Sequence, residues 1–312
     1  MISSIFGKTK PINFIILSVF LFLYYWVVQV YLFKNDFSVN QVVLETGVLS
    51  ILLFSVFVVD FIAKRNKLTE PNSYPILFYV LLFVVFPETL TDTNAILCSL
   101  LLLLATRRLL SIKSLKDVKS KVFDATLWIL TSSLFYDWAI VYLLLVFVAI
   151  YIYEPKNSRN WFVVLSATFA FFMISYAVLI LVGIPNFLWE HYNFRIDFAA
   201  IYPFNWGASI KISVYIIINL LLALWAFLAL GKSGTGKTIT VRLIALSFVL
   251  GLLVNVLVLS ESTYAIIITF FPCVIFICNY IDAIKRRNVL ELALIVCTVV
   301  TLIVFLGRLW VA

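Results

Sequence analysis

The sequence predicts an all-α protein, a polytopic bundle of about eleven transmembrane helices, from three observations. Hydrophobic residues make up 64% of the 312 residues and charged residues 12%, whereas soluble domains have about 45–50% and about 25%. The apolar residues form long runs, and short basic segments separate these runs. A soluble fold could not bury that much apolar surface, so we expect a multi-pass membrane protein.

The basic residues predict the number and direction of the crossings, because cationic loops stay on the cytoplasmic side during insertion. Nineteen of the 23 Lys and Arg residues fall into six clusters. The segments assigned to the cytoplasm then have 19 basic and 7 acidic residues, and the outer segments have 4 basic and 8 acidic. The clusters are Lys8/Lys10, Lys64/Arg65/Lys67, residues 107–121, Lys156/Arg159, Lys232/Lys237/Arg242 and Lys285/Arg286/Arg287.

The apolar runs between these clusters predict eleven spans, with the N-terminus in the cytoplasm and the C-terminus outside. The first run is about 20 residues long and no small-residue cleavage site follows it, so we expect an uncleaved span and not a signal peptide. The whole chain is expected to be one domain in the bacterial inner membrane. The spans lie near 12–33, 45–63, 74–87, 94–110, 122–136, 138–153, 162–183, 209–230, 240–259, 264–282 and 289–310.

One stretch, from Ala125 to Tyr153, resembles a single tilted helix because it is apolar except at Asp137. Basic segments flank it on both sides, so it must cross an even number of times. We therefore expect a turn near the outer surface at Tyr136-Asp137-Trp138. Each arm then has about 15 residues, or roughly 22 Å, which is short of the ~30 Å hydrocarbon core. The hairpin should lie in thinned bilayer or be re-entrant.

Two segments between the predicted spans have compositions that predict a particular structure. Residues 184–208 form the longest outer loop and contain His191, the only histidine, Arg195 and frequent aromatic residues. Such a loop is expected to lie along the membrane interface. On the cytoplasmic side, residues 111–121 place apolar side chains three apart with lysines between them. That spacing predicts a small amphipathic surface helix.

The segment from Gly231 to Thr238, GKSGTGKT, matches the phosphate-binding P-loop pattern. A P-loop requires a strand before it and a helix after it, so that backbone N–H groups surround the phosphates. Here the segment joins two apolar runs, and no parallel sheet is expected. We interpret it as a basic cytoplasmic loop and expect no bound nucleotide. The net charge of +8 is interpreted as an orientation signal and attraction to anionic lipids, with no nucleic-acid partner.

Ionisable residues in the middle of spans mark ion paths, and this chain has almost none, which disfavours a proton-coupled pump. The four cysteines lie in apolar runs and lack the spacing of a redox pair or a zinc site, so we expect no disulfide and no cofactor. Whether the protein requires a divalent metal is left undecided by the sequence. The polar residues inside the spans are amides, which more often join helices than bind substrate. They are Gln29, Asn219, Asn255 and Asn279.

The candidate site lies among acidic residues assigned to the outer face, which short loops over one bundle could bring together. Carboxylates beside an Arg and a His suit general-base chemistry next to a phosphate-bearing headgroup. Asp36, directly after the first span, is predicted as the general base. Arg195 and His191 would hold the phosphate, and Asp137 and Glu45 are further predicted substrate-binding residues. The alternative is that these are solvated loop residues.

Two stretches, KTKPINF at residues 8–14 and the block at 107–138 with RRLLS, FDA and SLFYDW, resemble an uncharacterised family of polytopic inner-membrane proteins of Bacteroidota. The chain also resembles GT-C glycosyltransferases in its span number, its inside N-terminus and the acidic residue of its first outer loop, the place of Asp36. That resemblance implies a transferase that uses a polyprenyl-phosphate-linked sugar at the outer leaflet. The chain has one Asp where that family has an acidic pair, and no soluble C-terminal domain is expected.

Three functions are carried forward as hypotheses. The first is the GT-C-like transferase. The second is a non-catalytic subunit or assembly factor of a cell-envelope complex, which would bind another membrane protein through its aromatic outer loop. The third is a lipid or small-molecule transporter, for which the span amides would line a groove open to both leaflets. In all three, membrane lipids surround the chain.

Overall fold

The computed structural model describes residues 2–33, 38–194, 206–230, 235–258 and 264–311. All regular elements within these ranges are helices, and they contain no strand. The chain groups into two compact units. The first contains residues 1–96, 210–233 and 270–312, and the second contains residues 97–209 and 234–269.

Eight helices of the described residues are long and apolar enough to cross a membrane, which confirms the all-helical prediction and indicates a multi-pass membrane protein. The other three predicted spans form shorter helices, so the count of eleven and the sides of the termini stay predictions. The eight segments are Pro11–Leu32, Val39–Arg65, Thr93–Ser114, Ser158–Val182, Ile210–Ala229, Gly236–Leu257, Ala265–Asp282 and Arg287–Gly307.

The first unit is built around α4 (Tyr74–Val85), in which all residues but the last are buried. Helices α2, α3, α12 and α13 pack against it. At 1.5 Å per residue its 12 residues cover about 18 Å, so α4 relies on these neighbours for its cover and not on lipid. The other elements are α1 (Ile2–Phe6), α2 (Pro11–Val27), η1 (Val28–Leu32), α3 (Val39–Arg65), η2 (Pro87–Leu90), α10 (Trp206–Leu230), α12 (Phe270–Asp282) and α13 (Arg287–Val311).

Pro87 explains where α4 ends. A proline disfavours the helical conformation of the residue before it, and Phe86 has φ −119° and ψ 65°, outside the helical region. The chain continues as the 3-10 helix η2, whose first residue is that proline. The short helix and the turn after it place η2 where Gln29 of η1 and Lys211 of α10 bond to it.

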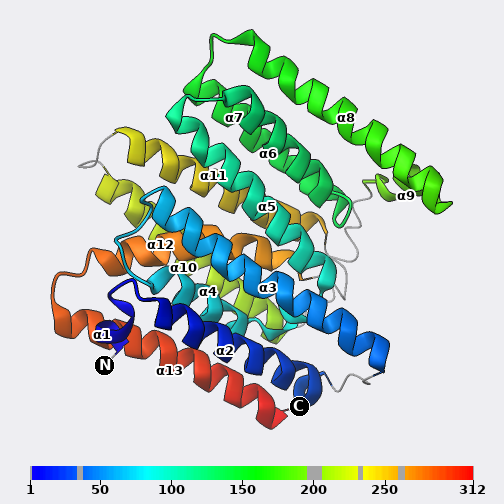
Figure 1. Ribbon diagram of the computed structural model, residues 1–312. Helices are drawn as coiled ribbons and strands as arrows, with labels where there is room; N and C mark the ends of the chain where they lie inside the picture. The colour runs from blue at the N-terminus through cyan, green and yellow to red at the C-terminus, as the bar shows by residue number, and fades with distance from the viewer. Residues whose placement is uncertain (1, 34–37, 195–205, 231–234, 259–263, 312) are drawn as a thin grey trace. The chain divides into compact units, whose positions relative to one another are not determined.

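The second unit packs α6 (Val118–Ser132) along α8 (Ser158–Val182), and Figure 1 shows both in green, running side by side. Tyr142 donates a hydrogen bond to the carbonyl of Ser247 at 2.8 Å. A Cβ atom at Gly251 would lie 2.9 Å from both Tyr142 Oη and Thr269 Cγ2, so three elements meet closely there. The remaining elements are α5 (Thr93–Ser111), η3 (Ile112–Ser114), η4 (Asp137–Tyr142), α7 (Leu143–Tyr153), α9 (Phe187–His191), α11 (Thr235–Leu257) and η5 (Ala265–Thr269).

The chain breaks between α6 and η4 at residues 133–136, next to the turn predicted at 136–138, of which Asp137 and Trp138 already belong to η4. Helix α6 ends at Ser132, and η4 begins at Asp137. Helix α6 contacts both η4 and α7, so the chain turns back on itself. The side of the membrane on which the turn lies stays a prediction.

The surface helix predicted for residues 111–121 is wrong as a single element. Leu115 and Asp117 have φ values of 53° and 48°, in the left-handed region that interrupts a right-handed helix. The chain therefore forms the short η3 before them and begins α6 at Val118. The three-residue spacing of apolar side chains does not detect two left-handed residues within the segment.

Candidate functional site

The five predicted site residues are divided between the two units and the undescribed segments. Asp36 and Arg195 lie outside the described residues. Glu45 belongs to the first unit, and Asp137 and His191 belong to the second. The roles predicted for all five stay predictions.

Glu45, in α3, is part of a buried polar cluster that includes residues of α2, η1 and η2. Its carboxylate accepts hydrogen bonds from Tyr25 Oη and, at 3.4 Å, from Gln29 Nε2. Gln29 is only 1% exposed and also donates to the carbonyl of Leu90 at 3.1 Å. It lies in the π-helical segment η1, a rare irregularity found often at functional sites. Glu45 therefore has protein partners for its carboxylate.

An ion pair that sequence reasoning missed lies at the same short helix, η2. Lys211 Nζ is 3.0 Å and 3.2 Å from the two carboxylate oxygens of Glu88, and it donates to the carbonyl of Val85 at 3.2 Å. It also lies 4.7 Å from the centre of the Phe86 ring, as in a cation–π contact. Both charged side chains are largely buried, at 19% and 14% exposed.

A signal for this pair was present in the sequence. Lys211 lies near the beginning of an apolar run, on the predicted outer side, where the positive-inside rule disfavours a cation. A lysine in that place needs a partner. We refer to Tyr25, Gln29, Glu45, Glu88 and Lys211 as the η2 cluster.

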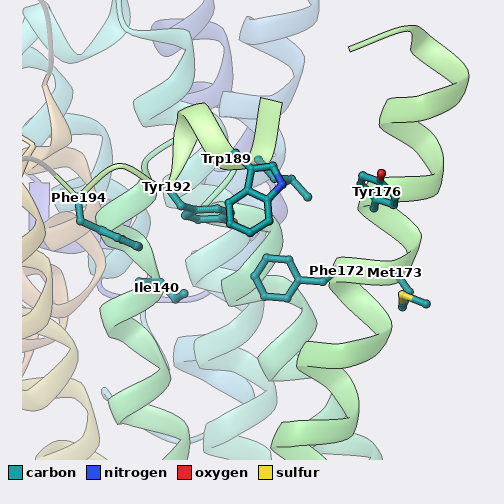
Figure 2. Close-up of a pocket in the computed structure, with 8 residues that line it drawn as sticks. Ile140, Phe172, Met173, Tyr176, Trp189, Tyr192 and Phe194 are labelled. Atoms are coloured by element: carbon teal, nitrogen blue, oxygen red, sulfur yellow. The ribbon is translucent and has the colours of Figure 1, made fainter. Parts of the chain in front are cut away.

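The second unit contains an apolar pocket of about 570 Å³, which we call the aromatic pocket. Figure 2 shows it between α8, the short helix α9 with the residues after it, and η4. The Tyr192 ring is 6.0 Å from the Phe172 ring and 5.9 Å from the Phe194 ring. Trp189 is 85% exposed, so its indole lies at the opening. The lining residues are Ile140, Phe172, Met173, Tyr176, Leu188, Trp189, Tyr192 and Phe194.

Polar groups hold α9 against the end of α6. His191 Nε2 lies 2.7 Å from the carbonyl oxygen of Ser133. Because a carbonyl only accepts, Nε2 donates, and Nδ1 is the nitrogen that can accept a bond from another group. Tyr192 Oη lies 2.7 Å from the Ser133 hydroxyl. Burial raises the pKa of the Tyr192 phenol, which therefore stays neutral at physiological pH.

Asp137 begins η4, the 3-10 helix that supplies the lining residue Ile140. Its Oδ1 accepts the backbone N–H of Trp138 at 2.8 Å, which fixes the beginning of η4. Burial is the main cause of the raised pKa of Tyr192, and the negative charge of Asp137 raises that pKa further. The Trp138 ring is 5.2 Å from that of Phe194. We call Ser133, Asp137, His191 and Tyr192 the polar edge. Only Tyr192 of these lines the pocket; the His191 ring lies 5.1 Å from the Tyr192 ring, and Asp137 acts on Tyr192 through its charge.

A second apolar groove, of about 410 Å³, also borders α8. Thr131 and Leu134 come from α6 and the turn after it, and Phe187 comes from α9. Helix α8 itself is poorly covered, since Leu181 is 86% exposed. A membrane helix with this exposure presents its apolar side chains to lipid tails.

The P-loop-like segment is only partly described, since residues 231–234 lie outside the described ranges. Thr235, Gly236, Lys237 and Thr238 form the first turn of α11. The segment that precedes them in sequence is the helix α10, where a P-loop has a strand. Within the described ranges, no group of three or more His, Cys, Asp or Glu residues could hold a metal ion.

Comparisons of the chain with protein-family models, curated proteins and solved structures give no match. The resemblance to the Bacteroidota family and the resemblance to GT-C glycosyltransferases therefore stay expectations. The function is inferred from the geometry of the two units alone.

Proposed function

We propose that this multi-pass membrane protein binds a polyprenyl-phosphate-linked substrate in the aromatic pocket and is a transferase of the outer leaflet of the bacterial inner membrane. The observation that supports the proposal is the pocket itself. Its volume of about 570 Å³ lies within the ~300–1,000 Å³ of ordinary ligand sites, which are mostly apolar with a few polar groups at defined places. The lining residues and the polar edge fit that description.

The surroundings of the pocket favour a lipid over a water-soluble ligand. The lining residues Met173 and Tyr176 of α8 are 56% and 47% exposed. In a bilayer, the side of α8 that presents such residues contacts acyl chains, so a lipid can enter laterally without crossing water. An isoprenoid chain would pack against the rings of Phe172, Trp189 and Tyr192.

The polar edge suits the other end of the same molecule. His191 Nδ1 and the Tyr192 hydroxyl oxygen can accept hydrogen bonds from sugar hydroxyls. Asp137 can accept sugar hydroxyls through its carboxylate. Arg195, which follows in the sequence, stays the predicted phosphate ligand, and Asp36 stays the predicted general base on sequence grounds.

The second candidate is the non-catalytic subunit of an envelope complex. One observation favours it. Only 17% of the most apolar stretch of α8 is buried, which leaves a long surface for another membrane protein. The transporter hypothesis depended on span amides. Of these, Asn219 and Asn279 donate to carbonyls of their own helices, at 2.8 Å and 2.7 Å, as helix-internal bonds.

The test of binding is photo-crosslinking of the purified chain in nanodiscs with a photoactivatable polyprenyl phosphate. We expect saturable labelling of peptides from α8 and α9, competed by unlabelled polyprenyl phosphate. Phe172→Ala should reduce labelling about tenfold, since a buried aromatic contact of that size contributes about 1.5 kcal/mol or more. The matched control is Phe162→Ala, on the same helix outside the pocket and 68% exposed, which should label normally. Equal labelling of the two variants would remove the proposal.

The chemical half of the proposal has its own test. Asp36→Asn should abolish sugar transfer while leaving abundance and labelling by the polyprenyl phosphate unchanged. Retained transfer in that variant would exclude Asp36 as the general base. If Asp36→Asn and wild type both bind the lipid but neither transfers sugar, and a second membrane protein co-purifies, the non-catalytic candidate is the correct one.

A further inference from the structure

A third pocket, of about 480 Å³, lies at the C-terminal end of α3 in the first unit, and the proposed function does not use it. It combines two aromatic residues, Phe57 and Phe61, with an acidic residue and three cations. Three positive charges and one negative charge give the pocket a net charge of +2. The pocket is therefore a candidate for an anionic ligand.

An apolar stripe leads along α3 to these charges. Phe54, Phe57 and Phe61 follow one another at spacings of three and four residues, so they share one face of the helix. They are 48%, 52% and 37% exposed, and the rings of Phe54 and Phe57 lie 6.3 Å apart. Lys64 and Arg65 follow one turn later. The surface thus passes from apolar rings to positive charge within about three turns.

The cations of the pocket differ in what they contact. Lys64 Nζ lies 2.6 Å from Asp60 Oδ2, so these two charges offset each other. Arg65 and Lys67 are exposed, and neither forms an ion pair with a described residue. The other carboxylate oxygen of Asp60 is buried and accepts no hydrogen bond from the described residues. The pocket therefore offers two positive charges that no described carboxylate offsets.

Lys67 has a backbone conformation that is unfavourable for residues other than glycine. It has φ 53°, in the left-handed region that glycine occupies most easily. The N–H of Lys67 bonds to the carbonyl of Lys64 at 3.1 Å, and that of Leu68 bonds to the carbonyl of Ala63 at 3.0 Å. This is a Schellman-type end, for which glycine is the usual residue. A lysine here adds a charge to the pocket where the backbone alone would favour glycine.

We propose that this pocket binds an anionic phospholipid such as phosphatidylglycerol. Its acyl chain lies along the stripe of Phe54, Phe57 and Phe61. Its phosphate is held by Arg65 and Lys67. The apolar stripe and the positive charge together select a lipid over free phosphate, because phosphate has no apolar part to pack on the rings.

The test uses the full-length chain in nanodiscs of phosphatidylcholine with or without phosphatidylglycerol, and native mass spectrometry counts the phosphatidylglycerol retained. Arg65→Gln/Lys67→Gln should retain about tenfold less phosphatidylglycerol, since each cation near an anionic lipid contributes several-fold in binding. The matched control, Lys285→Gln/Arg286→Gln, changes the charge equally at exposed positions outside the pocket. It should retain phosphatidylglycerol as the unmodified chain does.

A second variant separates binding from folding. Lys67→Gly removes one charge and at the same time relieves the left-handed backbone, so its melting temperature should be equal or higher while phosphatidylglycerol retention falls. Equal loss in the control double variant would show general electrostatic attraction and overturn the site. So would full retention in Arg65→Gln/Lys67→Gln, or displacement of the lipid by millimolar inorganic phosphate. None of these outcomes depends on labelling of the aromatic pocket.

Discussion

The η2 cluster and the aromatic pocket differ in how their polar groups are satisfied. In the η2 cluster, Lys211 contacts Glu88 and two neighbouring main-chain and ring groups, and Gln29 is bonded to Glu45 and a carbonyl. In the aromatic pocket, Trp189 is 85% exposed, and His191, which precedes the lining residue Tyr192, bonds through Nε2 to the carbonyl of Ser133. The first region is closed by protein partners, and the second is open to a ligand.

We therefore expect the buried charges of the η2 cluster to contribute mainly to stability, and the aromatic pocket to contribute mainly to the proposed binding. Removing one member of a buried ion pair leaves an uncompensated charge and is strongly destabilising. Removing an exposed side chain costs the folded state little. Mutations in the η2 cluster should therefore lower the free energy of unfolding, and mutations in the aromatic pocket should weaken ligand binding.

The largest effect is expected in the η2 cluster. Glu88→Gln leaves the Lys211 ammonium without its carboxylate, and we expect a loss of about 3 kcal/mol in unfolding free energy. Denaturant unfolding in detergent micelles, followed by circular dichroism, measures it. The double variant Glu88→Met/Lys211→Met removes both charges and should recover most of the loss. A single variant as stable as wild type would show that the pair is solvated and that the comparison does not hold.

A smaller effect is expected from over-packing in the second unit. Gly251→Ala places a Cβ atom 2.9 Å from Thr269 Cγ2 and Tyr142 Oη, and we expect about 2 kcal/mol of destabilisation. The control is Gly47→Ala in α3, where nothing lies within 4 Å of the added atom and a helix-favouring residue should be neutral or stabilising. Melting temperatures of the two variants, compared with that of the wild type, test this expectation. Equal melts would mean that η4, α11 and η5 are loosely packed.

A still smaller effect is expected at the polar edge of the pocket. Tyr192→Phe removes the hydroxyl that lies 2.7 Å from Ser133 Oγ, and should cost about 1 kcal/mol. A raised pKa in the folded state means that the Tyr192 phenol supports stability below about pH 10, its unfolded value, and loses that support as the pH rises further. Melting temperatures recorded between pH 8 and 11 should therefore fall less steeply for Tyr192→Phe. A steeper fall would contradict the assignment.

Much of the fold could be predicted from the sequence because lipid leaves few alternatives to helices. The apolar runs correspond to the eight long helices. The break after Ser132 follows from basic segments on both sides of an apolar stretch. The surface helix at 111–121 was wrong, because left-handed Leu115 and Asp117 are conformations that hydrophobic spacing does not reveal.

The candidate site was less predictable. Asp137 and His191 were singled out, and their roles stay predictions because neither lines the aromatic pocket. Their link to the pocket is through Tyr192, which, like Ser133, has no distinctive pattern in the sequence. Lys211 and Glu88 are 123 residues apart, so no local spacing could pair them. Only the position of Lys211 within an apolar run indicated that it needed a partner.

The central claim, that the aromatic pocket binds the lipid, is tested most directly by equilibrium binding of a polyprenyl phosphate to Phe172→Ala and Phe162→Ala in detergent micelles. The account predicts a Kd at least about tenfold weaker for Phe172→Ala, equivalent to about 1.4 kcal/mol, with an unchanged Kd for Phe162→Ala and near-native melting temperatures for both. The same Kd for the two variants would contradict it.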